Sequence, residues 1–568
     1  MNSVFAKHVR SCATYAMPFG LMSFTVVVAY QGWWYFHVNR LLKSLPPGPA
    51  PESPIMGLLR YLFPKWFDHG LYSSDLDLFW AEPLHEQYGD TFTLWQPPRK
   101  PRVITRNPSA IEEALRQDGK TWHFPADGID AMKEIYGSSI STLCGQEHAT
   151  RRSLINEWWI KDKGEGGESS FNQMLLAVHD IMNHGLFKKL KAAAQGAGSL
   201  PLSNTMKTFA LEGMLAVVFG AQVTKDLSDG HASDELSQAH ITLNWRIFGR
   251  LLGRTYTCWP KPISLMLERL DDILGGWNTK VRRAWQVFVP FLDSLDVPQD
   301  GGLASWMQSH MLTNPGQRMY WRGQAWDFID GGVDTVMAYL QQSLLLIYSP
   351  RLKTTLIDVR NEISGCQCVC ADGYHRLKPT AHNLSEDRLP LLESVLKECM
   401  RLFPPILTQL PRVNVKAGST RLCELLGMAP QAQTKVVLIL NIFGLHRHPV
   451  HWERPHEFLP ERWNVIKTGI SSYRPFGGGI HGCLSFKYLP FQLRMVVGDI
   501  INNFDLELDE NSANFIPDSF DSRSESSRQA VADVESLLLY DQGMAFERQP
   551  LTIRIRLRQH PKTHTDTC

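Results

Sequence analysis

The sequence predicts a mainly helical domain with small β-sheets, preceded by one transmembrane helix. Between about residues 105 and 400, apolar residues recur at spacings of three and four, the period of an amphipathic helix. β-type patterns are confined to short runs such as 436–440 and 551–557. Residues 16–38 are nearly free of charge and reach the ~20 residues that span a bilayer.

Length and composition limit the function. The 568 residues are 43% hydrophobic and 20% charged, which suits a large core with appendages. A formal net charge of +1 gives no reason to expect nucleic acid as a partner. The 10 cysteines are scattered, unlike a secreted disulfide scaffold, so reduced thiols are expected. The spacing Cys366-Gln-Cys368-Val-Cys370 leaves open a metal site or a plain surface loop after a helix.

The apolar segment 16–38 predicts an uncleaved membrane anchor. Aromatic residues 33–36 cluster at one end, as they do at a membrane interface. The alternative, a cleaved signal peptide, would have a shorter apolar core followed by small residues. Basic residues flank the segment equally, so the charge bias does not fix its orientation.

The chain divides into segments in a simple order. Residues 1–15 form a flank, 39–50 a proline-rich hinge that includes Leu45-Pro46-Pro47-Gly48-Pro49, 51–560 one domain and 561–568 a tail. Within the domain, 509–538 is rich in Ser, Asp and Glu and predicts a solvated insertion. The sequence contains no glycine-rich dinucleotide fingerprint after a strand, so it does not predict a nicotinamide or flavin site.

A glycine-rich loop, Phe476-Gly477-Gly478-Gly479-Ile480-His481-Gly482-Cys483-Leu484-Ser485, presents one cysteine ahead of an apolar helical run. Glycines let such a loop wrap closely and aim its amides at a sulfur atom. A thiolate is one of the few protein ligands that haem iron accepts. The loop therefore predicts a haem site with Cys483 as the iron ligand. The alternative is a buried cysteine beside a turn.

A predicted helix from about Trp321 to Ser349 contains Gly331-Gly332-Val333-Asp334-Thr335. Each glycine inside a helix costs about 1 kcal/mol relative to alanine, so a compensating role is expected. Adjacent glycines allow a local distortion that could admit O₂. Thr335 would then hydrogen-bond the iron-bound oxygen, and Asp334 would relay protons. The alternative is close helix packing at the glycines, with Thr335 bonding back to a carbonyl.

A further predicted helix places Glu398 and Arg401 on one face, three residues apart, and ends at Pro404-Pro405. Exposed pairs of this kind contribute only ~0.3–0.5 kcal/mol. The stretch Phe458-Leu459-Pro460-Glu461-Arg462-Trp463 follows downstream.

These motifs, in this order from about residue 45 to 558, resemble the cytochrome P450 family of haem-thiolate enzymes. The spacing of Phe476, Gly479, His481 and Cys483 is similar to the family's cysteine loop, although Ser485 replaces a usual glycine and His481 the commoner arginine. In the central helix, Val336 replaces the usual second alcohol. The resemblance implies a mainly α, triangular haem-thiolate fold with a small β region.

The resemblance also implies roles for individual residues. Glu398, Arg401 and Arg462 would form a buried triad that locks the cysteine loop, and loss of a partner would prevent haem incorporation. Three cations would clamp the haem propionates: Arg152, Arg412 and His481, although His148 stands where a tryptophan is expected. Pocket residues by motif offset are Phe328, Ile329, Ile406 and Leu407.

The implied reaction is monooxygenation of a lipophilic small molecule by haem b, with electrons from a separate NADPH-dependent P450 reductase. The implied location is the endoplasmic reticulum membrane, with the catalytic domain facing the cytosol. The divergent loop and the insertion are similar to fungal-type enzymes that tailor terpenoids, polyketides or alkaloids. Two alternatives stay open: a reductase-independent haem-thiolate isomerase or dehydratase, and a non-catalytic, membrane-tethered haem-binding protein. Residues 245–254 suit either a lip at the membrane surface or an ordinary amphipathic helix.

Overall fold

The computed structural model describes most of the predicted domain. The described residues are 36, 40–51, 78–95, 100–160, 170–196, 198–220, 231–256, 261–295, 302–369, 374–414, 420–466, 470–513, 527–541, 544–547 and 550–558. The predicted flank, the anchor 16–38 apart from Phe36, and the tail 561–568 lie outside them. No helix in the described part of the chain is long and apolar enough to cross a membrane.

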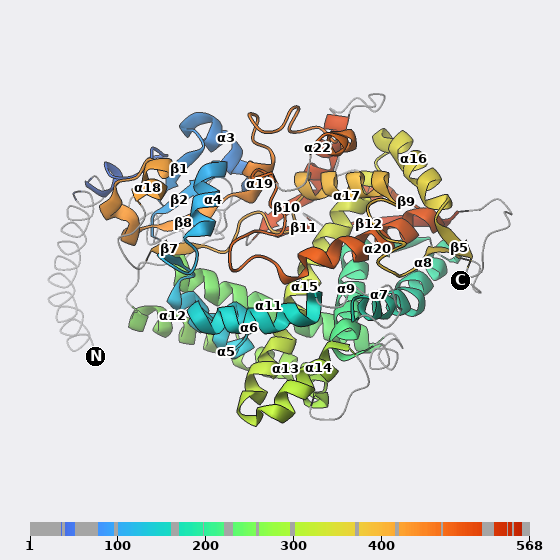
Figure 1. The fold of residues 1–568 in the computed structure, drawn as a ribbon, viewed down its shortest axis with the longest axis horizontal. Helices are drawn as coiled ribbons and strands as arrows, with labels where there is room; N and C mark the ends of the chain where they lie inside the picture. The colour runs from blue at the N-terminus through green and yellow to red at the C-terminus, as the bar shows by residue number, and fades with distance from the viewer. Residues whose placement is uncertain are drawn as a thin grey trace, which may run out of the picture.

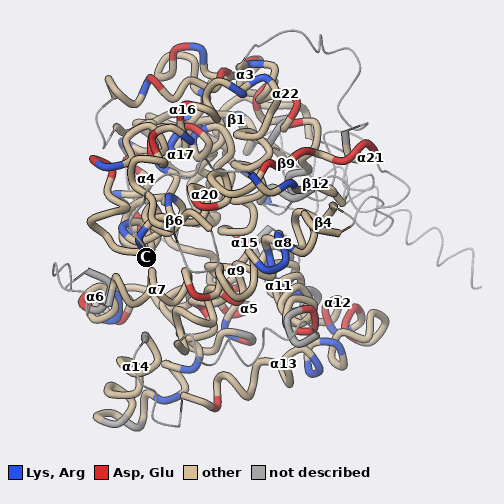
Figure 2. The backbone as a smooth tube through the Cα atoms, turned by 90° about the vertical axis from the view of Figure 1, so that its right-hand side faces the viewer, with Lys and Arg blue, Asp and Glu red and all other residues tan. Residues whose placement is uncertain are grey.

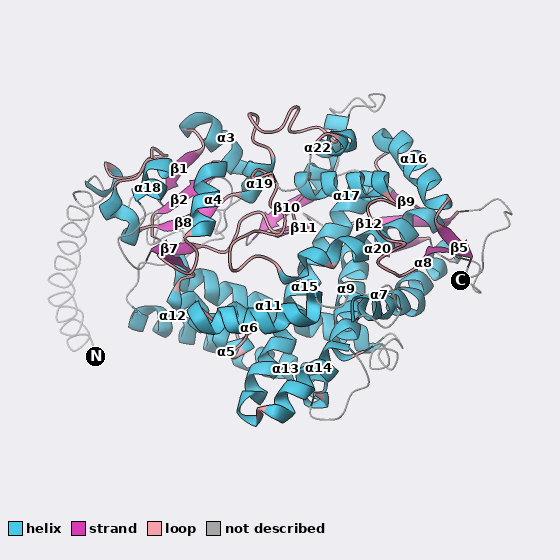
Figure 3. Ribbon diagram, in the orientation of Figure 1, coloured by secondary structure: helices cyan, strands magenta, loops and turns pink. Residues whose placement is uncertain are grey.

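Helices make up most of the described chain, and the strands gather in small groups (Figures 1 and 3). The α-helices of the first half are α3 (Leu78–Tyr88), α4 (Pro108–Arg116), α5 (Ala126–Tyr136), α6 (Gly145–Ile160), α7 (Ser170–Ile181), α8 (Phe187–Gln195), α9 (Leu202–Phe219), α11 (His231–Tyr256), α12 (Lys261–Leu274) and α13 (Trp277–Ser294). Those of the second half are α14 (Gly302–Thr313), α15 (Arg318–Ile347), α16 (Lys353–Ser364), α17 (Pro390–Leu402), α18 (Thr420–Leu426), α19 (Ile442–His446), α20 (Leu489–Asn503), α21 (Glu510–Ala513) and α22 (Ser527–Leu537). Shorter turns include the 3-10 helices η7 (Pro460–Asn464) and η8 (Leu484–Lys487).

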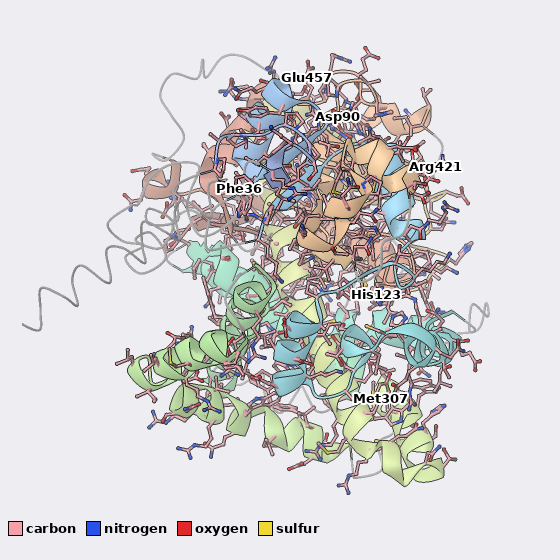
Figure 4. The ribbon with its side chains drawn as sticks, turned by 90° about the vertical axis from the view of Figure 1, so that its left-hand side faces the viewer. Phe36, Asp90, His123, Met307, Arg421 and Glu457 are labelled. Atoms are coloured by element: carbon pink, nitrogen blue, oxygen red, sulfur yellow. The ribbon has the colours of Figure 1, made fainter. Side chains whose placement is uncertain are left out.

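The strands form four small sheets. Their bounds are β1 (Thr91–Leu94), β2 (Arg102–Thr105), β3 (Trp122–His123), β4 (Ser199–Pro201), β5 (Gln367–Val369), β6 (His375–Leu377), β7 (Arg412–Asn414), β8 (Val437–Leu440), β9 (Phe504–Leu508), β10 (Leu538–Asp541), β11 (Met544–Glu547) and β12 (Thr552–Leu557). The largest sheet has the order β1-β2-β8-β7-β3, and only its β2–β8 pair is parallel. The others are β4-β12-β9, β5-β6 and β10-β11. Figure 4 shows Asp90 and Arg421 toward the large sheet, Met307 of α14 at the opposite end, and His123 of β3 between them.

The central element is α15, whose 30 residues are mostly buried. It packs along α9 and also contacts α5, α14, α17 and α20. Trp321 and Trp326 are almost fully buried within it, and such large side chains account for much of the apolar area removed from water. The helix therefore forms a rigid base for residues on either side of it.

Local sequence signals explain where other helices begin and end. Asn107 caps α4 by accepting the amide of Ala110, and Pro108 follows at the first helical position. Similarly, α17 begins with Pro390 and ends at Leu402, just before Pro404-Pro405. These two helices deliver residues of the site described below.

Several sequence predictions are confirmed. The predicted 321–349 helix is α15, and the runs 436–440 and 551–557 correspond to β8 and β12. The prediction of a solvated insertion over 509–538 is wrong for residues 527–537. They form α22, which buries Ala530, Val531 and Val534, because its apolar residues lie on one helical face despite many polar neighbours.

The expectation of reduced thiols is also wrong in one place, because Cys368 on β5 is disulfide-bonded. No group of His, Cys, Asp and Glu within the described residues is arranged to hold a metal ion on its own. Figure 2 shows Lys and Arg interspersed with Asp and Glu along the chain, as the near-zero net charge suggests.

Residues 245–254 lie within the long helix α11, and their arginines are engaged inside the protein. Arg246, Arg250 and Arg254 recur at four-residue spacing, so they share one face. Their acidic partners, from α5 and α12, are Glu134, Glu268, Asp271 and Asp272. The amphipathic-helix interpretation fits this arrangement, with the charges linking three helices.

Candidate haem-thiolate site

The glycine-rich loop folds tightly ahead of η8 and α20. Gly477 and Gly479 both have φ of 70°, a conformation that favours glycine. A Cβ atom on Gly479 would lie 2.8 Å from the backbone oxygen of Leu115 at the end of α4. The amide of Cys483 donates to the carbonyl of Phe476 across the loop at 2.9 Å. The loop therefore needs its glycines to sit against α4 and to present Cys483.

The side chain of Cys483 is accessible, although protein atoms surround it closely enough to desolvate the thiol. It is an exposed free cysteine, yet burial by neighbouring atoms raises the pKa of its thiol. The amide and hydroxyl of Ser485 hydrogen-bond the sulfur, and nearby Arg152 adds positive charge; both effects oppose burial. Because metals bind the thiolate form of cysteine, an iron held by this sulfur would displace its proton.

Three residues converge beside the loop around Asp118. Its carboxylate accepts hydrogen bonds from Arg412 of β7 at 3.1 and 3.2 Å, and lies 2.9 Å from Nδ1 of His481. Burial raises the pKa of Asp118, but the hydrogen bond from His481 and the charge of Arg412 outweigh it, so the pKa lies below its ordinary value. Arg412 also lies over the ring of Phe124, 4.1 Å from its centroid. Asp118 was not among the predicted site residues.

His148 and Arg152, both on α6, complete this side of the site. The rings of His148 and His481 are 4.3 Å apart between centroids. Burial, together with the charges of His481 and Arg152, lowers the pKa of His148 to about 4, so its imidazole is neutral. At the position where the resemblance expects tryptophan, the ring of His148 thus packs at a tilt against His481 of the loop.

These residues fit a haem with its propionates on the His481 side. In the described structure, Nε2 of His481 and Nδ1 of His148 are buried without a hydrogen-bond partner, and anionic carboxylates are acceptors for such groups. Gly331 is exposed although α15 is otherwise largely buried, and a Cβ atom there would meet nothing within 4 Å. Cys483, Arg152, Arg412 and His481 are residue types that could hold a haem iron and its propionates.

The predicted triad is brought together, with Glu398 and Arg401 fully buried and Arg462 partly buried. Arg401 donates to both oxygens of Glu398 at 2.8 and 3.0 Å, and Arg462 of η7 donates to the same carboxylate at 3.1 Å. The amide of Leu459 and the indole of Trp463 each add a bond at 3.0 Å. Glu398 and Arg401 are 0% exposed, so this is no solvated surface pair.

A hydrogen-bonded path joins the triad to the cysteine loop. Arg401 donates to the carbonyl of His446 at 2.8 Å, and Nε2 of His446 accepts the amide of Arg474 at 2.9 Å. Arg474 begins the turn that leads to Phe476. Burial, then the charges of Arg401 and Arg447, lowers the pKa of His446 to about 3, so its ring is neutral and can accept this bond.

On α15, Asp334 and Thr335 are held by neighbours. Asp334 lies 2.8 Å from Nζ of Lys207 and accepts a hydrogen bond from Asn244. Burial raises its pKa, but the charges of His240 and Lys207 lower it further, so the carboxyl is ionised. The Thr335 hydroxyl donates to the carbonyl of Gly331 at 2.8 Å, as the alternative interpretation of this motif expected.

The predicted pocket residues are divided by the structure. Ile406 is 43% exposed, whereas Ile329 and Leu407 are 0% exposed and Phe328 is 8% exposed, all three within the main core. The assignment of these residues to a substrate pocket stays a prediction, because side chains that line an internal pocket are also shielded from bulk solvent. A hollow of about 560 Å³ lies between α6 and α14 and is lined by none of these residues.

Comparisons with known proteins agree with this geometry. A model of the cytochrome P450 family matches residues 319–525, which contain α15, the triad and the cysteine loop. Cytochrome P450 71D179 of Thymus vulgaris is 26% identical over 495 residues, covering 83% of this chain and 87% of that protein. The indole-2-monooxygenase of Zea mays is 28% identical over 491 residues, 82% of each chain.

A shorter alignment joins the chain to the (+)-menthofuran synthase of Mentha piperita, at 30% identity over 189 residues. It spans 32% of this chain and 34% of that protein. The relatives are mostly plant proteins, so the expectation of a fungal-type enzyme is not supported. Over residues 319–525, which contain the cysteine loop and the triad, the chain matches the cytochrome P450 family, whose members are haem-thiolate monooxygenases that bind haem b through an axial cysteine.

Proposed function

We propose that this protein inserts one oxygen atom from O₂ into a lipophilic small molecule, using electrons from a separate NADPH-dependent P450 reductase. The observation that carries the proposal is the environment of Cys483: an accessible sulfur that accepts two hydrogen bonds from Ser485 beside the cation Arg152. A buried structural cysteine would be inaccessible and would not need such donors.

The chain's own residues would hold the cofactor from two sides. Cys483 would bind the iron, and Ser485 would withdraw electron density from the sulfur by donating to it. Arg152, Arg412 and His481 would pair with the propionates. When bound, haem supplies the activation of O₂ and the oxygen transfer. The triad would act structurally, by fixing the loop.

Asp334 and Thr335 of α15 would supply the protons that the reaction needs. The hydroxyl of Thr335 now donates to Gly331, and rotation about its side chain would redirect it to a ligand beside that glycine. Asp334 is ionised and paired, so it must receive a proton before it can give one. Protons therefore have to reach Asp334 through its buried neighbours.

The names of the relatives support a substrate class. Relatives carry names that refer to menthofuran, indole and isoflavone, and we propose a small lipophilic substrate of natural-product metabolism, such as a terpenoid, polyketide or alkaloid. We also propose attachment to the endoplasmic reticulum membrane through residues 16–38, with the catalytic domain on the cytosolic side.

The test uses the full-length protein, purified with haem, and its Cys483→Ala variant. The wild type is expected to give the thiolate-type CO spectrum on reduction, and the variant to lose it. With reductase, NADPH and isotopically labelled O₂, product should carry one labelled oxygen atom. A Cys483→Ala protein with an unchanged CO spectrum would overturn the proposal. Rearrangement of a substrate hydroperoxide together with no NADPH-dependent oxidation would favour the isomerase class, and substrate binding without oxidation would favour a haem-binding protein.

A further inference from the structure

Three buried carboxylates line one face of α15. Asp327, Asp330 and Asp334 are spaced by three and four residues, so they share that face, and they are 9%, 6% and 4% exposed. Burying one charge is costly unless it is paired and hydrogen-bonded, and burying three together is more so. Each of them must therefore have a compensating neighbour.

The neighbours come from four different elements. Ser141 bonds Asp327 through its hydroxyl at 2.8 Å and its amide at 3.1 Å. Asp330 accepts a hydrogen bond from Tyr136 of α5, and its Oδ1 lies 3.0 Å from Nε2 of His240 on α11. As described above, Lys207 of α9 and Asn244 of α11 hold Asp334.

His240 lies between two of these carboxylates. It is 0% exposed, it contacts Asp330, and its charge is one of the main influences that lower the pKa of Asp334. Within the described residues, His240 Nδ1 and Asn244 Oδ1 are buried with no hydrogen-bond partner. Proteins satisfy such groups with ordered water, so this face can hold bridging water molecules.

The spacing along the helix suits stepwise proton transfer. At 1.5 Å per residue, Asp330 lies about 4.5 Å along the axis from Asp327, and Asp334 about 6 Å further. One imidazole or one water molecule spans such a gap. The outer end lies at Ser141, which is half-buried, and the inner end lies next to Thr335. The face thus connects a partly exposed loop with the oxygen-binding side of α15.

The pKa of Asp327 lies above that of Asp334, so transfer toward Asp334 is uphill and would be driven by consumption of the proton in the reaction. Burial, which outweighs the hydrogen bonds from Ser141, raises the pKa of Asp327 to about 6, so this carboxyl takes up and releases protons near neutral pH. Asp334 is ionised and accepts protons. The other titratable groups that interact with this row are Lys207, Tyr136 and Tyr320.

We propose that Asp327, Asp330 and His240 form a proton-transfer chain that supplies Asp334 during turnover. The proposal rests on the proposed monooxygenase function. That reaction takes O₂, a C–H bond, two electrons and two protons, and gives one hydroxyl group and one water molecule; NADPH supplies the electrons and solvent the protons. Each proton enters at Asp327 and leaves at Asp334, and the chain returns to its starting state. These three act through Asp334 and are positioning residues.

The test compares two ways of driving the same haem-loaded protein. Turnover with NADPH, reductase and O₂ needs proton delivery, whereas oxidation of a peroxidase dye with cumene hydroperoxide does not use solvent protons for O₂ reduction. In Asp330→Asn and in His240→Gln, NADPH-driven O₂ consumption is expected to fall by about tenfold or more, while the hydroperoxide-driven rate is retained. Gln324→Leu is the matched control. It removes the side chain that accepts the Ile140 amide at 2.8 Å, loosening the same loop without removing a proton carrier.

A second readout does not depend on activity. Infrared difference spectra across a pH titration should show a buried carboxylic acid that titrates near pH 6 and is missing in Asp327→Asn. Equal losses of both activities in Asp330→Asn, unchanged NADPH-driven turnover in both variants, or the same loss in Gln324→Leu would overturn the chain. Wild-type protein that used hydroperoxide but consumed no NADPH would instead contradict the proposed function, and the infrared titration would still decide whether Asp327 titrates as the chain requires.

Discussion

Removal of the Glu398 carboxylate should unlock the cysteine loop. In the folded protein this carboxylate accepts five hydrogen bonds, including those from Arg401 and Arg462, and it is 0% exposed. Glu398→Ala leaves a guanidinium buried without its counter-charge, which costs on the order of 3–5 kcal/mol. Since a typical domain is stable by ~5–15 kcal/mol, the loss is a large share of the total.

The effect on haem follows from the path through His446. Arg401, freed from Glu398, no longer has a fixed orientation from which to donate to the His446 carbonyl. The ring that accepts the Arg474 amide at the start of the loop is then less well fixed. We therefore expect Glu398→Ala to abolish haem incorporation, measured as the reduced-CO absorbance per mole of protein, and Arg401→Ala to do the same.

A control beside the same helix separates this effect from a general loss of charge. Glu386 pairs with Lys397 of α17 at 2.6 Å, and its side chain is 57% exposed. Glu386→Gln should change the free energy of unfolding by less than about 1 kcal/mol and leave the CO spectrum intact. A normal CO spectrum and normal urea unfolding in Glu398→Ala would refute the reasoning.

Three further outcomes follow from other contacts. Burial raises the pKa of Asp499 to about 8, so folding takes up a proton between the unfolded value of 3.8 and about 8, and stability falls as pH rises through that window. Asp499→Asn should flatten this slope in unfolding measured from pH 4 to 8; an unchanged slope would contradict the assignment. Ser485→Ala removes a donor to the Cys483 sulfur and should lower the haem reduction potential in a redox titration, whereas Ser485→Thr keeps the hydroxyl and should not. Gly331→Ala should raise the free energy of unfolding of the haem-free protein by about 1 kcal/mol but weaken haem binding. Gly323→Ala should lower the free energy of unfolding, because its Cβ would lie 2.2 Å from a backbone oxygen. Equal effects of the two variants on unfolding would count against an open space at Gly331.

The sequence was most informative where the site residues are close together in the chain. Glu398 and Arg401 are one helical turn apart, and the cysteine loop is continuous, so their geometry follows from local rules. The helix carrying Asp334 was predictable from its apolar period, almost to its ends. Local sequence thus predicted the cysteine loop, two of the three triad members and the central helix.

The missing residues are those whose contacts span long stretches of chain. Asp118 meets Arg412 and His481 across 294 and 363 positions, and no local pattern marks an aspartate for that contact. His240 likewise reaches Asp330 only because α11 crosses α15. The burial of Ile329 and Leu407 in the core could not be predicted from motif offset either, since which side of an element is packed depends on the whole fold.

Two independent clamps hold the cysteine loop, and they differ in kind. On one side, Arg401 of the triad donates to the carbonyl of His446, and the neutral ring of His446 accepts the amide of Arg474. On the other side, Asp118 binds His481 directly. Asp118 also pairs with Arg412, so two of the three predicted propionate cations share one internal anion, whereas Arg152 has no ion pair with any of the described residues. A bound haem would add the negative charge of its propionates where two cations face one carboxylate, and the propionates and Asp118 would then share the two cations. The clamp formed by the triad should therefore be independent of haem loading, whereas the clamp formed by Asp118 should change with it.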